Sequence, residues 1–172
     1  MSDQQMINKA RRGNQKAFQE LIQQEKNKLY RMAYMYVKNE NDALDIVQET
    51  IYKAYISIKK LKKNQYFSTW LTRILINNAL DFIKKNKRVI PIEAMEEFRT
   101  TEIYEVEDHI DLVDAINQLH DQYKTVIILR YYQDFTVKQI AETLNCPEGT
   151  VKTHLHRAVK QLKMYLKEES IQ

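Results

Sequence analysis

The sequence predicts an all-α protein made of two small helical domains joined by an acidic linker. Only 2 Gly and 2 Pro occur among 172 residues, whereas average usage would supply about twenty. Sandwiches, barrels and doubly wound α/β folds need more turn residues than this. Apolar residues instead recur at spacings of three and four along most of the chain, as in amphipathic helices.

The first half of the chain predicts a series of amphipathic helices. The apolar pattern gives helices over 17–22 and 29–37 and a third over 42–57, followed by a polar, lysine-rich break at 61–66. Ser68 is a suitable N-cap for a long helix over about 69–85. The charge run at 84–88 and Pro91 end this unit, because proline does not easily continue a helix. We therefore expect a first domain over 1–88.

Charge is distributed unevenly along the chain. Residues 1–90 carry 18 Lys/Arg against 8 Asp/Glu, residues 91–123 carry 1 against 10, and residues 124–172 carry 8 against 5. This distribution predicts two domains that bind polyanions, joined by an acidic linker over 89–109. The alternative interpretation is that the lysines only solvate the helix surfaces.

The last fifty residues predict a helix-turn-helix within a second domain over 110–172. Thr136 and Gln139 have the spacing of a capping box, which indicates the start of a short helix. Asn145 and Cys146 form the turn, and Pro147 suits the first position of a second helix over 148–166. Two helices joined by a short turn make up the helix-turn-helix motif.

The second helix of this motif has a polar outer face, which we call the recognition face. Val151, Leu155 and Leu162 lie on its inner face. The recognition face consists of Thr150, Lys152, Thr153, His156, Arg157 and Lys160. Hydrogen-bonding and cationic side chains near the start of a helix suit the major groove of DNA. The alternative is a helical hairpin with an ordinary solvated face.

Other classes of function find little support in the sequence. A single cysteine, Cys146, cannot form an internal disulfide, and the N-terminus lacks an apolar signal segment, so we expect a cytoplasmic protein. No apolar stretch reaches the length of about 18 residues that a transmembrane helix needs. Phosphate-binding loops, HExxH motifs and metal-spaced Cys/His sets are absent, so we expect neither an enzyme nor a cofactor or metal.

Three motifs in the chain resemble the bacterial sigma-70 family, in particular its small extracytoplasmic-function (ECF) branch. Residues 135–158 resemble region 4, residues 42–50 resemble region 2.2, and residues 67–85 resemble regions 2.3 and 2.4. The resemblance implies a sigma factor that directs core RNA polymerase to specific promoters. The alternative is a freestanding helix-turn-helix regulator whose first domain senses a ligand or dimerises, but such a domain has no need for the first-half motifs.

One face of the helix over 42–57 is acidic within a basic domain. Asp42, Asp45, Gln48 and Glu49 make up this acidic stripe. The resemblance implies that it docks on the clamp helices of the largest polymerase subunit, where complementary charge guides association. The alternative is a solvated helix face with partial i,i+4 pairing.

The resemblance implies that the lysine-rich break and the following helix capture the −10 element as a single strand. Unpaired bases can stack on aromatic rings or be read along their edges, and cations hold the backbone. The residues assigned to this site are Lys62, Lys63, Asn64, Tyr66, Phe67, Arg73, Asn77, Asn78, Asp81, Lys84, Lys85 and Arg88. Trp70 has apolar neighbours at helical spacing, so we expect it in the core rather than on a stacking surface.

The resemblance also implies that the recognition face, together with Thr136, reads the −35 element in duplex form. Lys152 and Arg157 can contact guanine or phosphate. His154 and His156 diverge on the helix and do not suggest a metal pair.

The resemblance also has implications for regulation, because members of this branch are usually held inactive by an anti-sigma factor, often membrane-bound. The acidic linker either is simply solvated or threads through the polymerase channels that nascent RNA later occupies.

Overall fold

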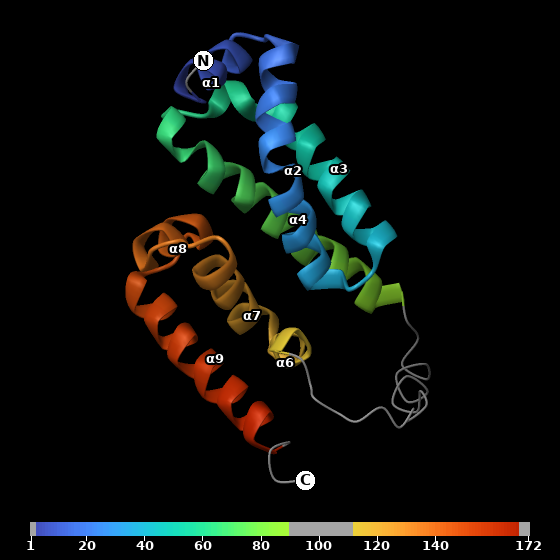
Figure 1. Cartoon of the computed structure of the whole chain (residues 1–172), viewed down its shortest axis with the longest axis vertical. Helices are drawn as coiled ribbons and strands as arrows, with labels where there is room; N and C mark the ends of the chain where they lie inside the picture. The colour runs from blue at the N-terminus through green and yellow to red at the C-terminus, as the bar shows by residue number, and fades with distance from the viewer. Residues whose placement is uncertain (1–2, 90–111, 169–172) are drawn as a thin grey trace.

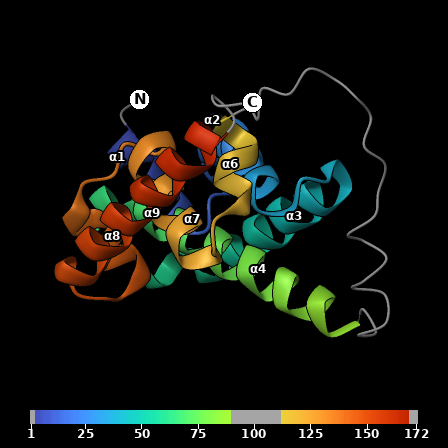
Figure 2. The same ribbon diagram turned by 90° about the horizontal axis from the view of Figure 1, so that it is seen from below.

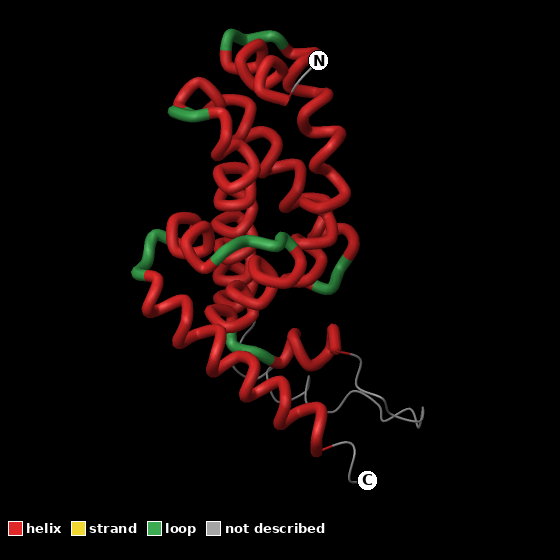
Figure 3. Tube along the Cα trace, turned by 60° about the vertical axis from the view of Figure 1, so that its left-hand side comes forward, coloured by secondary structure: helices red, strands yellow, loops and turns green. Residues whose placement is uncertain are grey.

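A computed structural model describes residues 3–89 and 112–168, and every regular element in these ranges is a helix (Figure 3). The prediction of an all-α protein is confirmed. The helices form two units (Figure 1). Apart from Val89, the predicted linker lies outside the described residues.

The N-terminal unit consists of four α-helices and two short 3-10 helices. Its elements are α1 (Asp3–Arg11), α2 (Gln15–Val37), α3 (Glu40–Ser57), η1 (Ile58–Lys60), η2 (Asn64–Tyr66) and α4 (Phe67–Val89). The long helices α2, α3 and α4 pack on one another, and α1 packs against α2. Leu29, Leu71 and Leu75 are fully buried between them.

Three differences from the sequence prediction concern the helices of the N-terminal unit. The predicted helices over 17–22 and 29–37 are one continuous helix, α2, because the polar residues between them favour helix without having to be buried. Helix α4 begins at Phe67, directly after η2, so Ser68 lies in its first turn and is not its N-cap. Helix α1, which the pattern did not predict, buries Met6 and Ile7.

The C-terminal unit contains the predicted helix-turn-helix. Its elements are α6 (Leu112–Gln118), α7 (Asp121–Ile127), the π-helical turn η3 (Ile128–Tyr132), α8 (Val137–Leu144) and α9 (Glu148–Glu168). The capping box is confirmed, because the Gln139 N–H donates to Thr136 Oγ1 and the Thr136 N–H donates to Gln139 Oε1. Asn145 ends α8 at a φ of 53°, and Pro147 immediately precedes α9.

The two units pack against each other through α2 and α4 of one unit and α6, α7 and α8 of the other. Helix α8 lies against α4, and α6 lies against α2. Helix α3 lies on the side of the N-terminal unit away from α8 and α9 in both views (Figures 1 and 2). The contact between the units therefore leaves α3 uncovered.

We expect Leu75→Ala to lower the free energy of unfolding by about 2–5 kcal/mol, because it opens a cavity where α4 meets α2 and α3. Leu44→Ala is the matched control, since Leu44 is 47% exposed on α3, and should cost under about 1 kcal/mol. Urea unfolding followed by circular dichroism measures both variants. Equal losses would contradict the assigned core.

Candidate nucleic-acid and partner interfaces

The acidic stripe lies along the exposed face of α3. Asp45, Gln48 and Glu49 are exposed, whereas Asp42 is half-buried in the first turn. The backbone N–H of Asp42 donates to the Asn39 side chain that caps the helix. A carboxylate in the first turn also stabilises the helix dipole, so Asp42 has a structural role in addition to its charge. Glu49 forms an i,i+4 ion pair with Lys53 at 3.4 Å.

Exposed aromatic and aliphatic side chains continue the acidic stripe toward the end of α3. Tyr52 is 61% exposed and Ile56 is 59% exposed. Tyr55 contacts the Phe18 ring of α2 edge-on and accepts a hydrogen bond from Gln15 Nε2. Together with Gln48, Tyr52 and Tyr55 line an apolar groove between α2 and α3. Sequence reasoning missed these tyrosines, although Tyr52 follows Gln48 by four residues and Tyr55 follows Tyr52 by three, which places them on the same face.

A hollow of about 550 Å³ lies at the start of α4. We call it the basic hollow, because Lys60, Lys62, Lys63 and Arg73 line it. The rest of its wall comes from Leu61, Tyr66, Thr69 and Trp70 of the N-terminal unit, and from Glu142 and Thr143 of α8 in the other unit. Four of the residues assigned to −10 capture thus converge: Lys62, Lys63, Tyr66 and Arg73.

Trp70, which the sequence predicts in the core, lies between the core and the basic hollow. Its ring packs against that of buried Phe67 with centroids 6.0 Å apart. Trp70 is only half-buried, and it lines the basic hollow beside Tyr66. The hollow therefore presents an indole and a phenol among four cations, and both ring types stack on unpaired bases.

Three of the assigned −10 residues have structural partners instead of an open surface. Asn64 joins the loop to α1, since its Nδ2 donates to Asn8 and to the Gln4 carbonyl, and its Oδ1 accepts from Arg11. Phe67 is buried in the core. The prediction that Asn78 reads a base edge does not fit its position at 6% exposure.

Asn78 links α4 to α3. Its Oδ1 accepts from Lys53 Nζ at 2.6 Å, and its Nδ2 donates to Thr50 Oγ1 at 3.0 Å. The Thr50 hydroxyl in turn donates to the Ile46 carbonyl. Both polar ends of the amide are therefore used inside the protein, whereas neighbouring Asn77 is exposed.

The remaining assigned −10 residues lie further along α4. Asn77 and Lys84 are exposed, and Arg88 lies in the last turn. Asp81 and Lys85 line a polar pocket between α3 and α4 beside Asp45 and Glu49. The structure therefore places Asp81 and Lys85 next to the acidic stripe and not in the basic hollow.

The recognition face lies on the exposed side of α9. Lys152, Thr153, His156, Arg157 and Lys160 are exposed, and Thr150 is half-buried. The opposite side of α9 buries Val151, Ala158 and Leu162 against α6, α7 and α8. Thr136 lies at the N-cap of α8, where its hydroxyl oxygen accepts the Gln139 N–H. His154 contacts the Tyr123 ring edge-on, so it belongs to the packing of the unit.

Within 3–89 and 112–168, no three His, Cys, Asp or Glu side chains are grouped so that they could hold a metal ion. None of the helices described is both long and apolar enough to cross a membrane.

Comparison with known proteins identifies both units. The family model of sigma-70 region 2 matches residues 21–89, and that of sigma-70 region 4 matches residues 109–162. The chain is 39% identical over 155 residues to the RNA polymerase sigma factor SigV of Bacillus subtilis, which covers 87% of this chain and 91% of SigV. The chain belongs to the ECF sigma factors. It is therefore a promoter-specificity subunit of bacterial RNA polymerase.

Further relatives agree with this assignment. The ECF sigma factor SigW of Bacillus subtilis is 34% identical, and the match covers 94% of this chain and 95% of SigW. The solved structure of CnrH in complex with the cytosolic domain of CnrY has the same fold, with a TM-score of 0.74, 23% identity, and coverage of 96% of this chain and 97% of CnrH. The match over nearly the whole length decides against a freestanding helix-turn-helix regulator, because the N-terminal unit is itself a sigma region.

We expect Asn78→Ala to lower the free energy of unfolding by about 1–3 kcal/mol, because it leaves Thr50 and Lys53 without their amide partner. Asn77→Ala is the matched control and should stay within about 0.5 kcal/mol of the parent, because Asn77 is exposed. Chemical denaturation of the three proteins measures the difference. An Asn78→Ala variant as stable as the parent would show that this hydrogen-bond network contributes nothing.

Proposed function

We propose that the sigma factor divides its work among three surfaces. The acidic stripe and Tyr52 dock on core polymerase, the basic hollow captures the −10 strand, and the recognition face reads the −35 duplex. The observation that carries this division is the basic hollow, where four cations and two aromatic rings converge from residues 60–73. A cationic groove with stacking rings is the usual construction of a single-strand site.

In the basic hollow, each kind of side chain has a separate role. Lys60, Lys62, Lys63 and Arg73 hold the phosphates, while Tyr66 and Trp70 stack on bases that leave the duplex. Asn77 lies one helical turn beyond Arg73 on α4 and is exposed, so it is the amide available to a base edge. Asn78 instead supports the helix that carries these residues.

Docking on polymerase combines charge with an apolar contact. The carboxylates Asp45 and Glu49 give orientation and a fast encounter with a basic surface. Tyr52 adds an exposed ring next to the apolar groove, and aromatic side chains are enriched where protein interfaces bury most surface. Helix α3 is uncovered by the C-terminal unit, so the docking surface is accessible in the packed chain.

We also propose that an anti-sigma factor controls this sigma factor. The structural neighbour CnrH was solved with the cytosolic domain of CnrY, and RpoE of Bartonella quintana was solved with the anti-sigma factor NepR. We infer further that the protein acts by binding and catalyses no reaction of its own. Its place of action is the cytoplasm, because polymerase and chromosome are there.

Reversing two carboxylates of the acidic stripe tests the docking role. We expect Asp45→Lys with Glu49→Lys to weaken binding to core polymerase by about 100-fold or more, because like charges then face each other across the interface. Fluorescence titration with purified core enzyme measures the affinity. Glu20→Lys with Glu25→Lys makes the same charge change on α2 and should leave it unaltered. Parental affinity in the stripe variant would overturn the docking assignment.

Removing one cation from the recognition face tests −35 reading. We expect Arg157→Ala to reduce promoter-specific transcription in vitro by about 10- to 100-fold, because a base contact from Arg contributes about 1–3 kcal/mol. Core binding should be unchanged, because Arg157 lies on the exposed side of α9. Lys163→Ala, on the same helix outside the recognition face, is the control. Equal transcription by the two variants would reject the role of Arg157.

A further inference from the structure

We propose that the C-terminal unit covers the basic hollow in the free chain, and that this closed state requires the buried hydroxyl of Tyr36 to be paired with Thr125. The proposal rests on the proposed −10 role of the hollow and adds a step of regulation within the chain. In this closed state α8 occupies one side of the hollow, so strand capture requires the two units to separate.

The hydrogen bond joins helices of different units. Tyr36 Oη of α2 lies 2.7 Å from Thr125 Oγ1 of α7, and both residues are buried. The Thr125 hydroxyl donates to the Asp121 carbonyl at 2.7 Å. A hydroxyl has a single hydrogen, so Tyr36 is the donor and Thr125 the acceptor. Burial raises the pKa of the Tyr36 phenol well above its ordinary value, which keeps this donor protonated.

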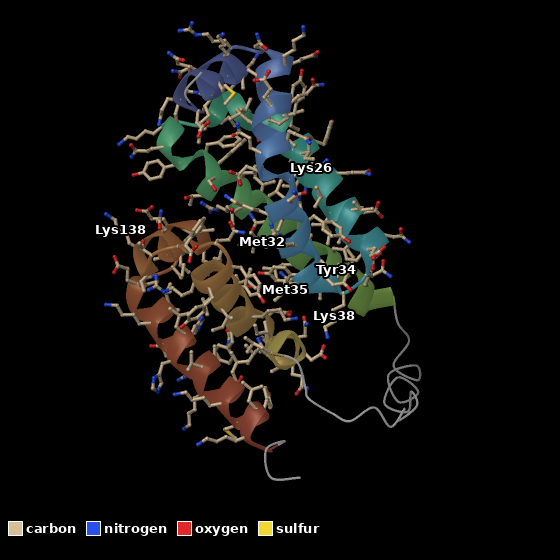
Figure 4. All side chains as sticks on the ribbon, in the orientation of Figure 1. Lys26, Met32, Tyr34, Met35, Lys38 and Lys138 are labelled. Carbon is tan, nitrogen blue, oxygen red and sulfur yellow. The ribbon has the colours of Figure 1, made fainter. Side chains whose placement is uncertain are left out.

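Apolar side chains also lie at the contact between the two units. Met32 and Met35 of α2 lie on the side that faces the C-terminal unit (Figure 4), and Ile128 of η3 is fully buried nearby. A pocket of about 160 Å³ remains among these residues. Lys28, Arg31, Tyr132 and Gln133 complete its lining, so it opens to the surface beside the apolar contact. The exposed ion pair between Lys38 and Asp114 adds little, because solvent screens it.

The closed state affects one binding surface and leaves two accessible. Glu142 places a carboxylate, and Thr143 a hydroxyl, at the wall of a hollow whose other charged side chains are cations. A strand phosphate and Glu142 are both attracted to those cations, so they compete for the same space. The acidic stripe and the recognition face remain exposed. Closure therefore blocks strand capture without blocking polymerase docking.

Promoter geometry also requires separation of the units. Positions −35 and −10 are about 25 base pairs apart, which corresponds to about 85 Å of B-DNA. In the closed state α8 lies directly against α4, so the helix-turn-helix is beside the hollow. The two surfaces cannot reach both elements of one promoter until the contact opens.

The decisive variant is Thr125→Val. Valine keeps the shape of the threonine side chain but cannot accept a hydrogen bond. The Tyr36 hydroxyl is then buried without an acceptor in the closed state. In the open state water accepts its hydrogen bond, so the substitution destabilises only the closed state. The double variant Tyr36→Phe/Thr125→Val removes both partners and leaves no unpaired donor, so it should close again. Tyr30→Phe removes a hydroxyl elsewhere on α2 and is the matched control.

Opening is measured by energy transfer between dyes on the full chain. The dyes are attached at Lys26→Cys on α2 and Lys138→Cys on α8, which are both exposed (Figure 4), with Cys146→Ser in every protein. We expect Thr125→Val to raise the ratio of open to closed molecules by about 5- to 100-fold. The double variant and Tyr30→Phe should match the parent. The proposal would be overturned if Thr125→Val had the same energy-transfer efficiency as the parent, or if the double variant stayed open.

Strand capture is measured separately with a pool of fluorescent single-stranded oligonucleotides of random sequence. Affinity should rise with the open fraction in Thr125→Val and return to the parental value in the double variant. Arg73→Ala should abolish the gain, since Arg73 lines the hollow. If Arg73→Ala weakens binding while Thr125→Val leaves it unchanged, the −10 role stands and the covering role fails. If Thr125→Val opens the chain but Arg73 has no effect, the −10 role of the hollow fails, and so does the covering role that rests on it.

Discussion

The pairing of the buried hydroxyls of Tyr36 and Thr125 is the constraint that the contact between the two units has to satisfy. Buried apolar residues of the two units form one continuous core, and the contact also contains a polar pair that must be satisfied in a dry environment. Because hydroxyl groups require defined distances and angles, the pair specifies one relative position, which an apolar contact alone would specify less strictly. In this position α8 lies against α4, beside the basic hollow.

Positive and negative side chains are separated on different faces of the N-terminal unit. The cations of the lysine-rich break converge because η1, η2 and the start of α4 form a compact turn that Asn64 ties to α1. The carboxylates of the acidic stripe lie on α3, on the opposite side of the N-terminal unit from the C-terminal unit. In the proposed division of work, DNA and polymerase therefore bind different faces, which avoids repulsion between DNA phosphates and the carboxylates of the stripe.

Local signals in the sequence predicted the fold well where a residue acts on its immediate neighbours. The capping box of Thr136 and Gln139 and the turn at Asn145 depend on backbone geometry within a few residues, and both appear as expected. The inner and outer faces of α9 follow from helical periodicity alone. The expected Ser68 cap was wrong because η2 feeds directly into α4, and a preceding 3-10 turn leaves no recognisable pattern in the sequence.

The sequence by itself determined the all-α class, the helix-turn-helix and the two sets of charged residues, because composition, periodicity and capping are local properties. Only the tertiary structure decided which of the assigned residues are exposed and so available to a binding partner. Asn77 and Asn78 are adjacent and chemically identical, yet one is exposed and the other is bound to Thr50 and Lys53 of α3. The same holds for Tyr36 and Thr125, which are 89 residues apart. Contacts between distant segments depend on how whole helices pack, and no local pattern encodes that packing.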